Sequence, residues 1–345
     1  MDNKTPHQIK VCLYLEYYHF FGGFMFKNMG TGIVSSYKNQ QTMLKSLNIP
    51  FTEKWDDSCD IFQTNTQWIR SIYLMKKARR RGKKIIIWAH ITVEDGMAVF
   101  RFIRYIAPLL KKYYTYAYGL ADVVFCPTEY TKTLLLGYGL PEKKLQVQSN
   151  AVDLKKFYVD EGKRQTGRAK FNLQKMTVGT VGQVNPRKGV DTFLELAGKF
   201  TDNQFLWVGN FFSPLLVKPL HKNPPANVKF TGYVEDILEG FNALDIFIFP
   251  SYEENQGMVI LEAAAVGLPI LVRDIPAYSH WLVHGQNCLK AKNNQEFESY
   301  LKMLLTDGDL RVKLSQNAKI LAEHESLEAL GQKLKRVYEN LVYGN

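Results

Sequence analysis

Cysteines are few in this sequence, and long apolar runs are absent. The four cysteines among 345 residues, Cys12, Cys59, Cys126 and Cys288, include no Cys-x-x-Cys pair. This spacing argues against a disulfide framework and a zinc site, and it is typical of reduced thiols in the cytosol. No apolar run approaches the roughly 20 residues that a bilayer-spanning helix needs. The first residues also lack the basic start and apolar segment of a signal peptide, so we expect a globular protein inside the cell.

Acidic residues are scarce in the first part of the chain. Residues 1–150 contain 21 Lys and Arg against 11 Asp and Glu, whereas the rest of the chain contains 23 against 22. Almost the whole net charge of +11 therefore belongs to the first 150 residues. A surface with this charge faces an anionic partner, and nucleic acid, an acidic substrate and an anionic membrane are the candidates.

Strand-like and helix-like runs alternate through both halves of the chain. Residues 83–90, KKIIIWAH, contain a continuous apolar run of the kind found in buried parallel strands. Such alternation is typical of βα units, so two sets predict an α/β protein with two Rossmann-like domains. The link between them is expected near residues 146–162, and residues 315–343 are expected to form one continuous helix. Ligands of such folds bind beyond the carboxyl ends of the strands.

The segment PSYEENQGMVILEAAAVGLP, residues 250–269, carries two glutamates around a glycine and an apolar run. A strand is expected to end near Pro250, and a helix to begin shortly before Met258. Unpaired N–H groups at a helix start suit a diphosphate, and Gly257 lets a ligand approach the backbone.

The spacing of the two glutamates leaves their role open. Eight residues at helical rise would separate Glu254 and Glu262 by about 12 Å, which suits a nucleotide sugar lying along the segment. Equally, Glu254 could be a helix N-terminal acid and Glu262 a solvated residue. An unpaired carboxylate within an apolar run is costly, however, and this favours a partner for Glu262.

Several segments together resemble the signature of the retaining GT-B glycosyltransferases of family 4. The resemblance is strongest over residues 177–290 and implies a GT-B fold, with two Rossmann-like domains facing across a cleft. It places an acceptor domain at 1–150, a nucleotide-sugar domain at 151–325, and a helix at about 325–345 that returns to the first domain. The segments are ENQGMVILEAAAVGLP, VGQVNPRKGVDTFLELA, VKFTGYV, ADVVFCPTEYTKTLLLGYG and SNAVDLKKF.

More narrowly, the chain is similar to bacterial glycolipid synthases. The resemblance lies in GTGIVSSYKNQQTMLKSLNIPFT, KARRRGKKIIIWAHITVEDG and LKKYYTYAYGLADVVFCPTEYTKTLL. It implies transfer of glucose or galactose from a UDP-sugar to diacylglycerol or monoglycosyl-diacylglycerol. The alternative is a soluble family-4 enzyme that acts on a polysaccharide or a small molecule.

The family resemblance also implies roles for single residues. Glu254 would hold the donor hexose, Glu262 the ribose and Lys188 the diphosphate, while His90 would lie near the donor sugar. The chain departs from the family at Gln183, where an arginine is common, and at Ala151, where a glycine is common. The implied catalytic residues are His90, Glu254 and Lys188, and the implied donor-binding residues are Gly30, Gly32, Arg187, Lys188, Tyr233, Val234, Asn255, Gln256, Gly257, Met258 and Glu262.

Residues 76–84, KKARRRGKK, are followed by an amphipathic pattern over 97–119. A helix of this kind can lie in a membrane interface, with its cations toward anionic headgroups. It could also be an ordinary helix that buries its apolar stripe in the first domain. Pro108 is expected to kink or split it. The expected membrane-binding residues are Lys76, Lys77, Arg79, Arg80, Arg81, Lys83, Lys84, Arg101, Phe102, Arg104, Lys111 and Lys112.

Two further expectations concern metals or cofactors and nucleic acid. No His, Cys and Asp cluster has metal-ligand spacing, and the DGD string at 307–309 is interpreted as a helix cap and turn, so we expect neither a metal nor a cofactor. The basic composition would also allow nucleic-acid binding. No nucleic-acid motif is recognised, however, and that interpretation leaves the Glu254 and Glu262 segment unexplained.

Overall fold

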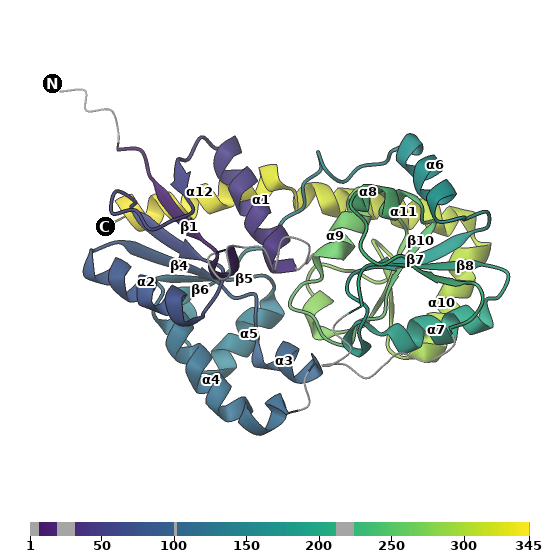
Figure 1. The fold of residues 1–345 in the computed structure, drawn as a ribbon, viewed down its shortest axis with the longest axis horizontal. Helices are drawn as coiled ribbons and strands as arrows, with labels where there is room; N and C mark the ends of the chain where they lie inside the picture. The colour runs from purple at the N-terminus through teal and green to yellow at the C-terminus, as the bar shows by residue number, and fades with distance from the viewer. Residues whose placement is uncertain (1–6, 19–31, 100–101, 212–223, 345) are drawn as a thin grey trace. The chain divides into compact units, whose positions relative to one another are not determined.

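The computed structural model describes residues 7–18, 32–99, 102–211 and 224–344. It divides into two compact units (Figure 1). The first comprises Met1–Gly96, Phe102–Ala151 and Leu327–Asn345, and the second comprises Met97–Arg101 and Val152–Ser326. Each unit is built on a parallel sheet with helices packed against it, which confirms the prediction of an α/β protein with two Rossmann-like domains.

The first unit contains a sheet of six strands within the described residues, in the order β2-β1-β3-β4-β5-β6. Every pairing in it is parallel. Its strands are β1 Val11–Tyr14, β2 Phe51–Thr52, β3 Ile61–Thr64, β4 Lys84–Trp88, β5 Val123–Cys126 and β6 Leu145–Val147. Its helices are η1 Glu16–Tyr18, α1 Gly32–Ser46, α2 Ile69–Arg80, α3 Val93–Val99, α4 Ile103–Gly119, α5 Glu129–Gly137, η3 Glu142–Lys144 and α12 Leu327–Tyr343.

The last helix of the chain, α12, completes the core of the first unit. It lies beside α1 (Figure 1). Leu330, Leu334 and Tyr338 are buried in the same cluster as Leu13 and Met43. Residues more than 280 positions apart in the sequence therefore form one hydrophobic core.

One prediction about the helices was wrong, and a second is decided only in part. The helix predicted over 315–343 is interrupted, because α11 ends at His324 and Ser326 forms a β-bridge with Val152. Pro108 was expected to kink or split its helix; α4 continues through it without a split, and the kink stays a prediction.

The second unit also contains six parallel strands within the described part of the chain, in the order β12-β11-β10-β7-β8-β9. Its strands are β7 Thr177–Val181, β8 Gln204–Val208, β9 Val228–Phe230, β10 Ile246–Phe249, β11 Ile270–Arg273 and β12 Leu289–Ala291. Its helices are α6 Glu161–Lys170, η4 Pro186–Lys188, α7 Val190–Lys199, α8 Ile237–Asn242, α9 Met258–Ala265, η5 Pro276–Tyr278, α10 Asn294–Thr306 and α11 Gly308–His324.

The position where the family commonly has glycine keeps a glycine-like backbone. Ala151 has a φ of 61°, in the left-handed region that residues with a Cβ rarely adopt. The carbonyl oxygens of Asn150 and Ala151 accept hydrogen bonds from the Asn39 side chain at 3.1 and 2.9 Å. These contacts offset the cost of placing alanine there.

We expect Leu334→Ala to lower the free energy of unfolding by about 2–5 kcal/mol, because it removes a fully buried side chain that joins α12 to the first core. Urea denaturation followed by fluorescence measures the change. Lys333→Ala is the matched control, since Lys333 is the exposed neighbour on the same helix. Equal unfolding midpoints for the two variants would contradict the role assigned to α12.

Candidate functional site

Three loops of the second unit carry most of the residues expected to bind the donor. They follow β7, β9 and β10, so all three leave the sheet at the carboxyl ends of parallel strands. The loop after β7 holds Arg187 and Lys188, and the loop after β9 holds Tyr233 and Val234. The loop after β10 holds Glu254 and leads into α9.

The loop after β7 is fixed by its own side chains and by the neighbouring loop. The Asn185 side chain accepts a hydrogen bond from the backbone N–H of Lys188 at 3.1 Å and so caps η4. Gly189 has a φ of 76°, and a Cβ at this position would collide with the Pro250 carbonyl. The backbone N–H of Tyr252 donates to the Arg187 carbonyl at 2.8 Å. The two loops are therefore held together through their backbones.

Glu254 is the centre of a charged cluster in this pair of loops. Its side chain is 6% exposed. The Oε1 atom accepts hydrogen bonds from Ser251 Oγ at 2.7 Å, from Arg187 Nη1 at 3.2 Å and from Lys188 Nζ. The Lys188 ammonium also lies over the Phe249 ring, 4.9 Å from its centroid. Glu254, which is expected to bind the hexose, therefore contacts Lys188 and Arg187, which are expected to bind the donor diphosphate.

The charge of Glu254 is maintained by these partners. Burial is the largest single influence and opposes ionisation, but the charges of Lys188 and Arg187, together with hydrogen bonds, outweigh it. The pKa of Glu254 is therefore lowered, and the carboxylate is ionised near neutral pH. The same cations can neutralise a phosphate when one displaces the carboxylate.

Glu254 precedes the helix, which corrects the estimate of its separation from Glu262. The helix α9 begins at Met258, and Gly257 at its start has a φ of 80°. Only the steps from Met258 to Glu262 follow helical rise, so the distance of about 12 Å derived for a continuous helix does not apply. Asn255 and Gln256 lie in the turn between the two glutamates.

Glu262 has a different environment from Glu254. It is partly buried, and burial raises its pKa to about 7 while Lys156 opposes the shift. No hydrogen bond or ion pair joins its carboxylate to another of the described residues. A ligand with hydroxyl groups would supply the donors that the carboxylate needs once it is ionised.

The loop after β9 places the residues expected to meet the base. Gly232 pairs with Gly209 in an antiparallel bridge, which joins the ends of β8 and β9. Tyr233 is 53% exposed, whereas Val234 is buried. The backbone here is fixed while the tyrosine ring is available to a ligand.

Two residues that sequence reasoning did not single out support the Glu254 loop. Ser251 is fully buried and donates to Glu254. Arg273 is a buried cation that donates to the Pro250 carbonyl at 3.1 Å and lies 4.1 Å from the Tyr252 ring centroid. A charged residue ending the apolar run ILVR of β11 is the signal that could have identified Arg273.

In the first unit, His90 follows β4 at the carboxyl end of its sheet. Its Nε2 lies 2.8 Å from Asn65 Oδ1, and its ring stacks on Trp88 with centroids 5.8 Å apart. Burial lowers the pKa of His90 to about 3, so the ring is neutral. Gly32 is the exposed first residue of α1, whereas Gly30 lies outside the described residues.

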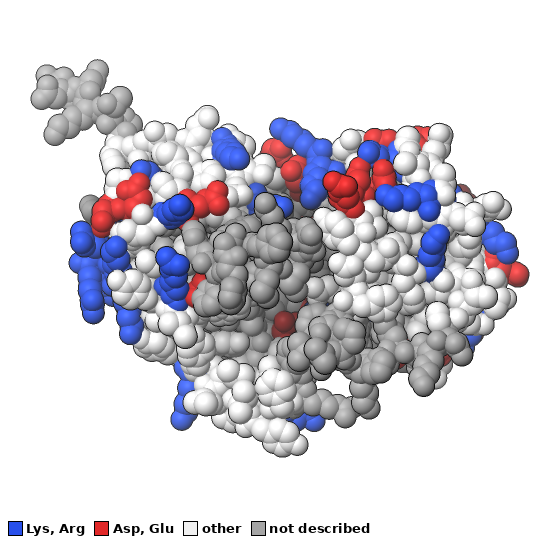
Figure 2. Space-filling view, viewed as in Figure 1, with Lys and Arg blue, Asp and Glu red and all other residues white. Residues whose placement is uncertain are grey.

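The basic residues expected to meet a membrane lie mainly on α2 and α4. Basic side chains gather over the region of α2 in Figure 2. Some have internal partners: Arg79 donates to the Leu120 carbonyl, Arg81 pairs with Asp57 at 3.2 Å, and Lys111 pairs with Glu94 at 3.0 Å. Lys76, Arg80, Lys84, Arg104 and Lys112 are exposed, Lys77 and Lys83 are partly exposed, and Arg101 lies outside the described residues.

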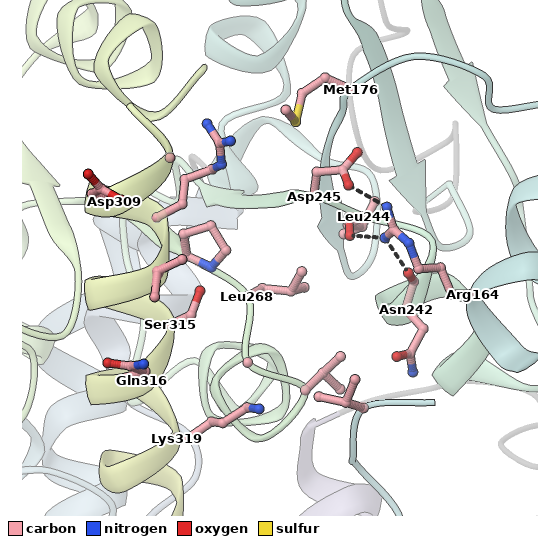
Figure 3. Close-up of a pocket in the computed structure, with 17 residues that line it drawn as sticks. Arg164, Met176, Asn242, Leu244, Asp245, Leu268, Asp309, Ser315, Gln316 and Lys319 are labelled. Carbon is pink, nitrogen blue, oxygen red and sulfur yellow. Dashed lines mark hydrogen bonds and ion pairs between the residues drawn. The ribbon is translucent and has the colours of Figure 1, made fainter. Parts of the chain in front are cut away.

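A cavity of about 740 Å³ in the second unit does not contain these donor residues (Figure 3). It is lined by Met176, Asp245 and Pro269, which directly precede β7, β10 and β11. It therefore lies at the amino ends of the strands, opposite the donor loops. Arg164 and Asp245 within it bond to each other at 2.5 Å, which gives them a structural role.

Two observations concern metals and membrane spans. Within the described ranges, no group of three or more His, Cys, Asp and Glu side chains could hold a metal ion. Asp307 caps α11 by accepting from the Leu310 N–H at 2.9 Å, as interpreted from the DGD string. Among the described helices, none has the length and apolarity needed to cross a bilayer.

Comparisons with known proteins agree with this arrangement. Two glycosyltransferase family models match the chain: "Glycosyl transferases group 1" over residues 163–321 and "Glycosyltransferase Family 4" over residues 45–156. The crystal structure of Anabaena HepE in complex with UDP-glucose superposes with a TM-score of 0.78 at 16% identity, covering 97% of this chain and 100% of that one. This likeness supports the fold.

Two curated relatives match the chain over most of its length. Processive diacylglycerol alpha-glucosyltransferase of Acholeplasma laidlawii is 31% identical over 320 residues, which is 90% of this chain and 94% of that protein. Alpha-galactosylglucosyldiacylglycerol synthase of Streptococcus pneumoniae is 28% identical over 282 residues, covering 77% of this chain and 74% of that protein. With this identity and coverage, the chain belongs to the group 1, family 4 glycosyltransferases of GT-B fold.

Proposed function

We propose that this glycosyltransferase moves a hexose, glucose or galactose, from a UDP-sugar to diacylglycerol or monoglycosyl-diacylglycerol, with retention of the anomeric configuration. The names of the two relatives support the lipid acceptor. The UDP-glucose bound to the HepE structure supports the donor. The Glu254 cluster is the observation that best supports a UDP-sugar donor. It brings a carboxylate and two cations together at the carboxyl ends of the strands.

Binding of the donor would replace the ion pairs of Glu254 with Lys188 and Arg187. The diphosphate competes with Glu254 for Lys188 and Arg187, and the carboxylate released by this exchange accepts hydrogen bonds from hexose hydroxyls. The ionised Glu262 accepts from the ribose hydroxyls, and the backbone around Tyr233 and Val234 meets the base. The positive charge on Lys188 stabilises the phosphate as the leaving group gains negative charge.

Retention of configuration follows from the chemistry of donor and product. Glucose is α-linked in UDP-glucose, and the name of the first relative describes an alpha-glucosyl transfer. The bond from the anomeric carbon to the phosphate oxygen breaks, and a bond from that carbon to the acceptor oxygen forms on the same face. The acceptor proton passes to the leaving phosphate.

The enzyme would reach its lipid acceptor at a membrane surface. Phe102, which directly precedes α4, and Tyr105 and Leu109 on α4 are 61%, 88% and 69% exposed. Their spacing of three to four residues puts them on one side of the helix. This exposure favours a surface role for part of the apolar stripe over its complete burial in the core of the first unit, since Ile103, Leu110 and Tyr113 are only partly buried. Such a surface with cations beside it is typical of proteins that bind lipid interfaces.

The apolar surface extends from α4 onto α2. Ile69 and Tyr73 on α2 are 85% and 63% exposed. Lys76 of α2 lies 5.3 Å from the ring centroid of Tyr116 of α4, and Tyr113 donates to the Gln67 carbonyl just before α2. The two helices are therefore in contact. We name this region the α2–α4 surface; its apolar residues are Ile69, Tyr73, Phe102, Tyr105, Ile106, Leu109 and Tyr116.

Incubation with radiolabelled UDP-glucose or UDP-galactose tests the proposal. Diacylglycerol and monoglycosyl-diacylglycerol are presented separately in mixed micelles, and the lipid products are separated by chromatography. Labelled glycolipid with the α configuration supports the proposal. Transfer only to a soluble sugar or polysaccharide would support the alternative of a soluble enzyme instead.

Glu262→Gln should weaken the binding of free UDP by about 1–3 kcal/mol, because it removes the charged acceptor of the ribose hydroxyls. Glu254→Gln should not weaken it, since it releases Lys188 and Arg187 for the diphosphate, while hexose transfer falls. Calorimetry with UDP measures both. Equal losses of affinity would contradict this division of roles.

The same experiment has a pH dependence. The affinity for UDP should rise as the pH increases through the Glu262 pKa of about 7, since only the ionised carboxylate accepts both hydroxyls. Glu262→Gln is the control for titration of UDP itself, and its affinity should lack this rise.

Activity should be the same with and without EDTA, because Lys188, Arg187 and the start of α9 provide the positive charge that a diphosphate needs. Initial rates measured after gel filtration in EDTA provide the test. Loss of activity that only magnesium or manganese restores would show that the cations are insufficient.

Replacing Tyr105 and Leu109 together with serine should reduce binding to vesicles of anionic lipid, because each buried apolar side chain contributes about 1.5–3 kcal/mol. Val312→Ser combined with Ile320→Ser is the matched control, since these residues are similarly exposed in the second unit. Vesicle flotation measures binding.

The contribution of basic residues to membrane binding is tested separately by a variant that combines Arg80→Gln, Lys84→Gln and Arg104→Gln. Each basic residue near an anionic surface contributes about 1 kcal/mol, and less at high salt. Lys313→Gln with Lys319→Gln is the control in the second unit. Unchanged flotation of both the serine and the glutamine variants would rule out the α2–α4 surface.

A further inference from the structure

A buried network of neutral side chains connects the last helix of the chain to His90. Tyr338 of α12 donates its hydroxyl proton to Gln63 Oε1 at 2.6 Å, and Gln63 Nε2 donates to Gln40 Oε1 at 2.8 Å. Gln40 Nε2 donates to Asn65 Oδ1 at 2.7 Å, and Asn65 Oδ1 lies 2.8 Å from His90 Nε2. The four residues from Tyr338 to Asn65 are fully buried.

The orientation of each amide in this network is fixed by its neighbours. Gln40 and Asn65 form a reciprocal pair, since Asn65 Nδ2 donates back to Gln40 Oε1 at 3.0 Å. Gln40 Nε2 also donates to Ser36 Oγ at 3.1 Å, and Ser36 gives its own proton to Asn150 Oδ1 at 2.7 Å. Turning one amide would place oxygen against oxygen, so the amides can reverse only together.

The direction of the network determines which nitrogen of His90 carries the hydrogen. Asn65 presents its oxygen to His90 and cannot donate from it. A neutral imidazole has one N–H, so the contact at Nε2 requires the hydrogen to be there. Nδ1 then meets any group as an acceptor and not as a donor.

We propose that Gln40 and Asn65 are positioning residues that hold His90 as the Nε2–H tautomer, with Gln63 and Tyr338 holding Gln40 in place from the other side. The proposal rests on the proposed glycosyl transfer and on the place near the donor sugar that the family resemblance implies for His90. It goes beyond that function because it assigns a role to α1, β3 and α12, which carry none of the expected catalytic residues.

Nuclear magnetic resonance of the full-length protein labelled with ¹⁵N-histidine measures the tautomer directly. The two ring nitrogens of a neutral histidine differ in chemical shift according to which one carries the hydrogen. His90→Gln identifies the His90 signals among the seven histidines. The expected result is a single neutral Nε2–H form. Hydrogen on Nδ1, or a mixture in the unaltered protein, would overturn the proposal.

Gln40→Met tests the positioning role, because methionine has a similar shape but cannot orient Asn65. We expect mixed tautomers of His90 and a fall in kcat of roughly tenfold with little change in the donor KM, since small misplacements at a reacting centre cost up to about 10²-fold. Gln148→Met is the matched control: Gln148 is buried in the same unit but donates to the Leu330 carbonyl, outside the network.

Asn65→Ser is the second variant should Gln40→Met fail to fold, because a serine hydroxyl both donates and accepts and so does not select a tautomer. A single Nε2–H form with unchanged kcat in the folded variants would overturn the positioning role. Failure of the role implied for His90 can be told apart from failure of this proposal. The first would appear as full activity of His90→Gln, whereas the tautomer of His90 is measured without substrate.

Discussion

Parallel pairing of the strands in each sheet makes every strand end at the same edge, and the candidate site depends on this constraint. Lys188 and Glu254 are 66 residues apart, and the Gly232 turn lies between them in the sequence. Only the neighbouring positions of β10 and β7 bring the first two together. The loops after β7 and β10 both leave the sheet at this edge. The carboxylate of Glu254 and the cations of Arg187 and Lys188 therefore meet in one buried cluster.

The two loops after β7 and β10 depend on each other for their shape. Gly189 allows the first loop to approach Pro250, and Arg273 holds that carbonyl from the other side. Burying Arg273 without an acidic partner is costly, but three hydrogen-bond acceptors and the faces of two rings replace part of the lost hydration. These backbone contacts do not involve the Glu254 carboxylate, so the proposed exchange of its cations for a ligand would leave them in place.

The sequence predicted the strands well because short, continuous apolar runs between turn residues are typical of buried parallel strands, as in the residues of β4 and β10. It singled out Glu262 because a carboxylate within an apolar run is unusual, and in the structure burial raises the pKa of this residue to about 7, while its role in binding stays a prediction. The return of the last helix to the first unit was expected from the family resemblance alone, and the sequence could not reveal which residues of α12 enter that core or that Glu254 contacts Lys188. These contacts join residues far apart in the chain and leave no local pattern. The start of α9 was uncertain for another reason: Gly257 sets the helix start through its backbone conformation and not through its side chain.

The two units treat buried polar groups in opposite ways. In the second, Glu254 and its partners carry charge, so their interaction changes with pH, salt and bound anions. In the first, the amides around His90 are neutral and their hydrogen bonds are directional, so they hold orientation without responding to charge. A diphosphate, as proposed for the Glu254 cluster, needs cations that can change partners, whereas a histidine proposed to meet a sugar hydroxyl needs a fixed donor and acceptor pattern. The charged cluster and the neutral amide network therefore each have the physical character that the proposed ligand requires.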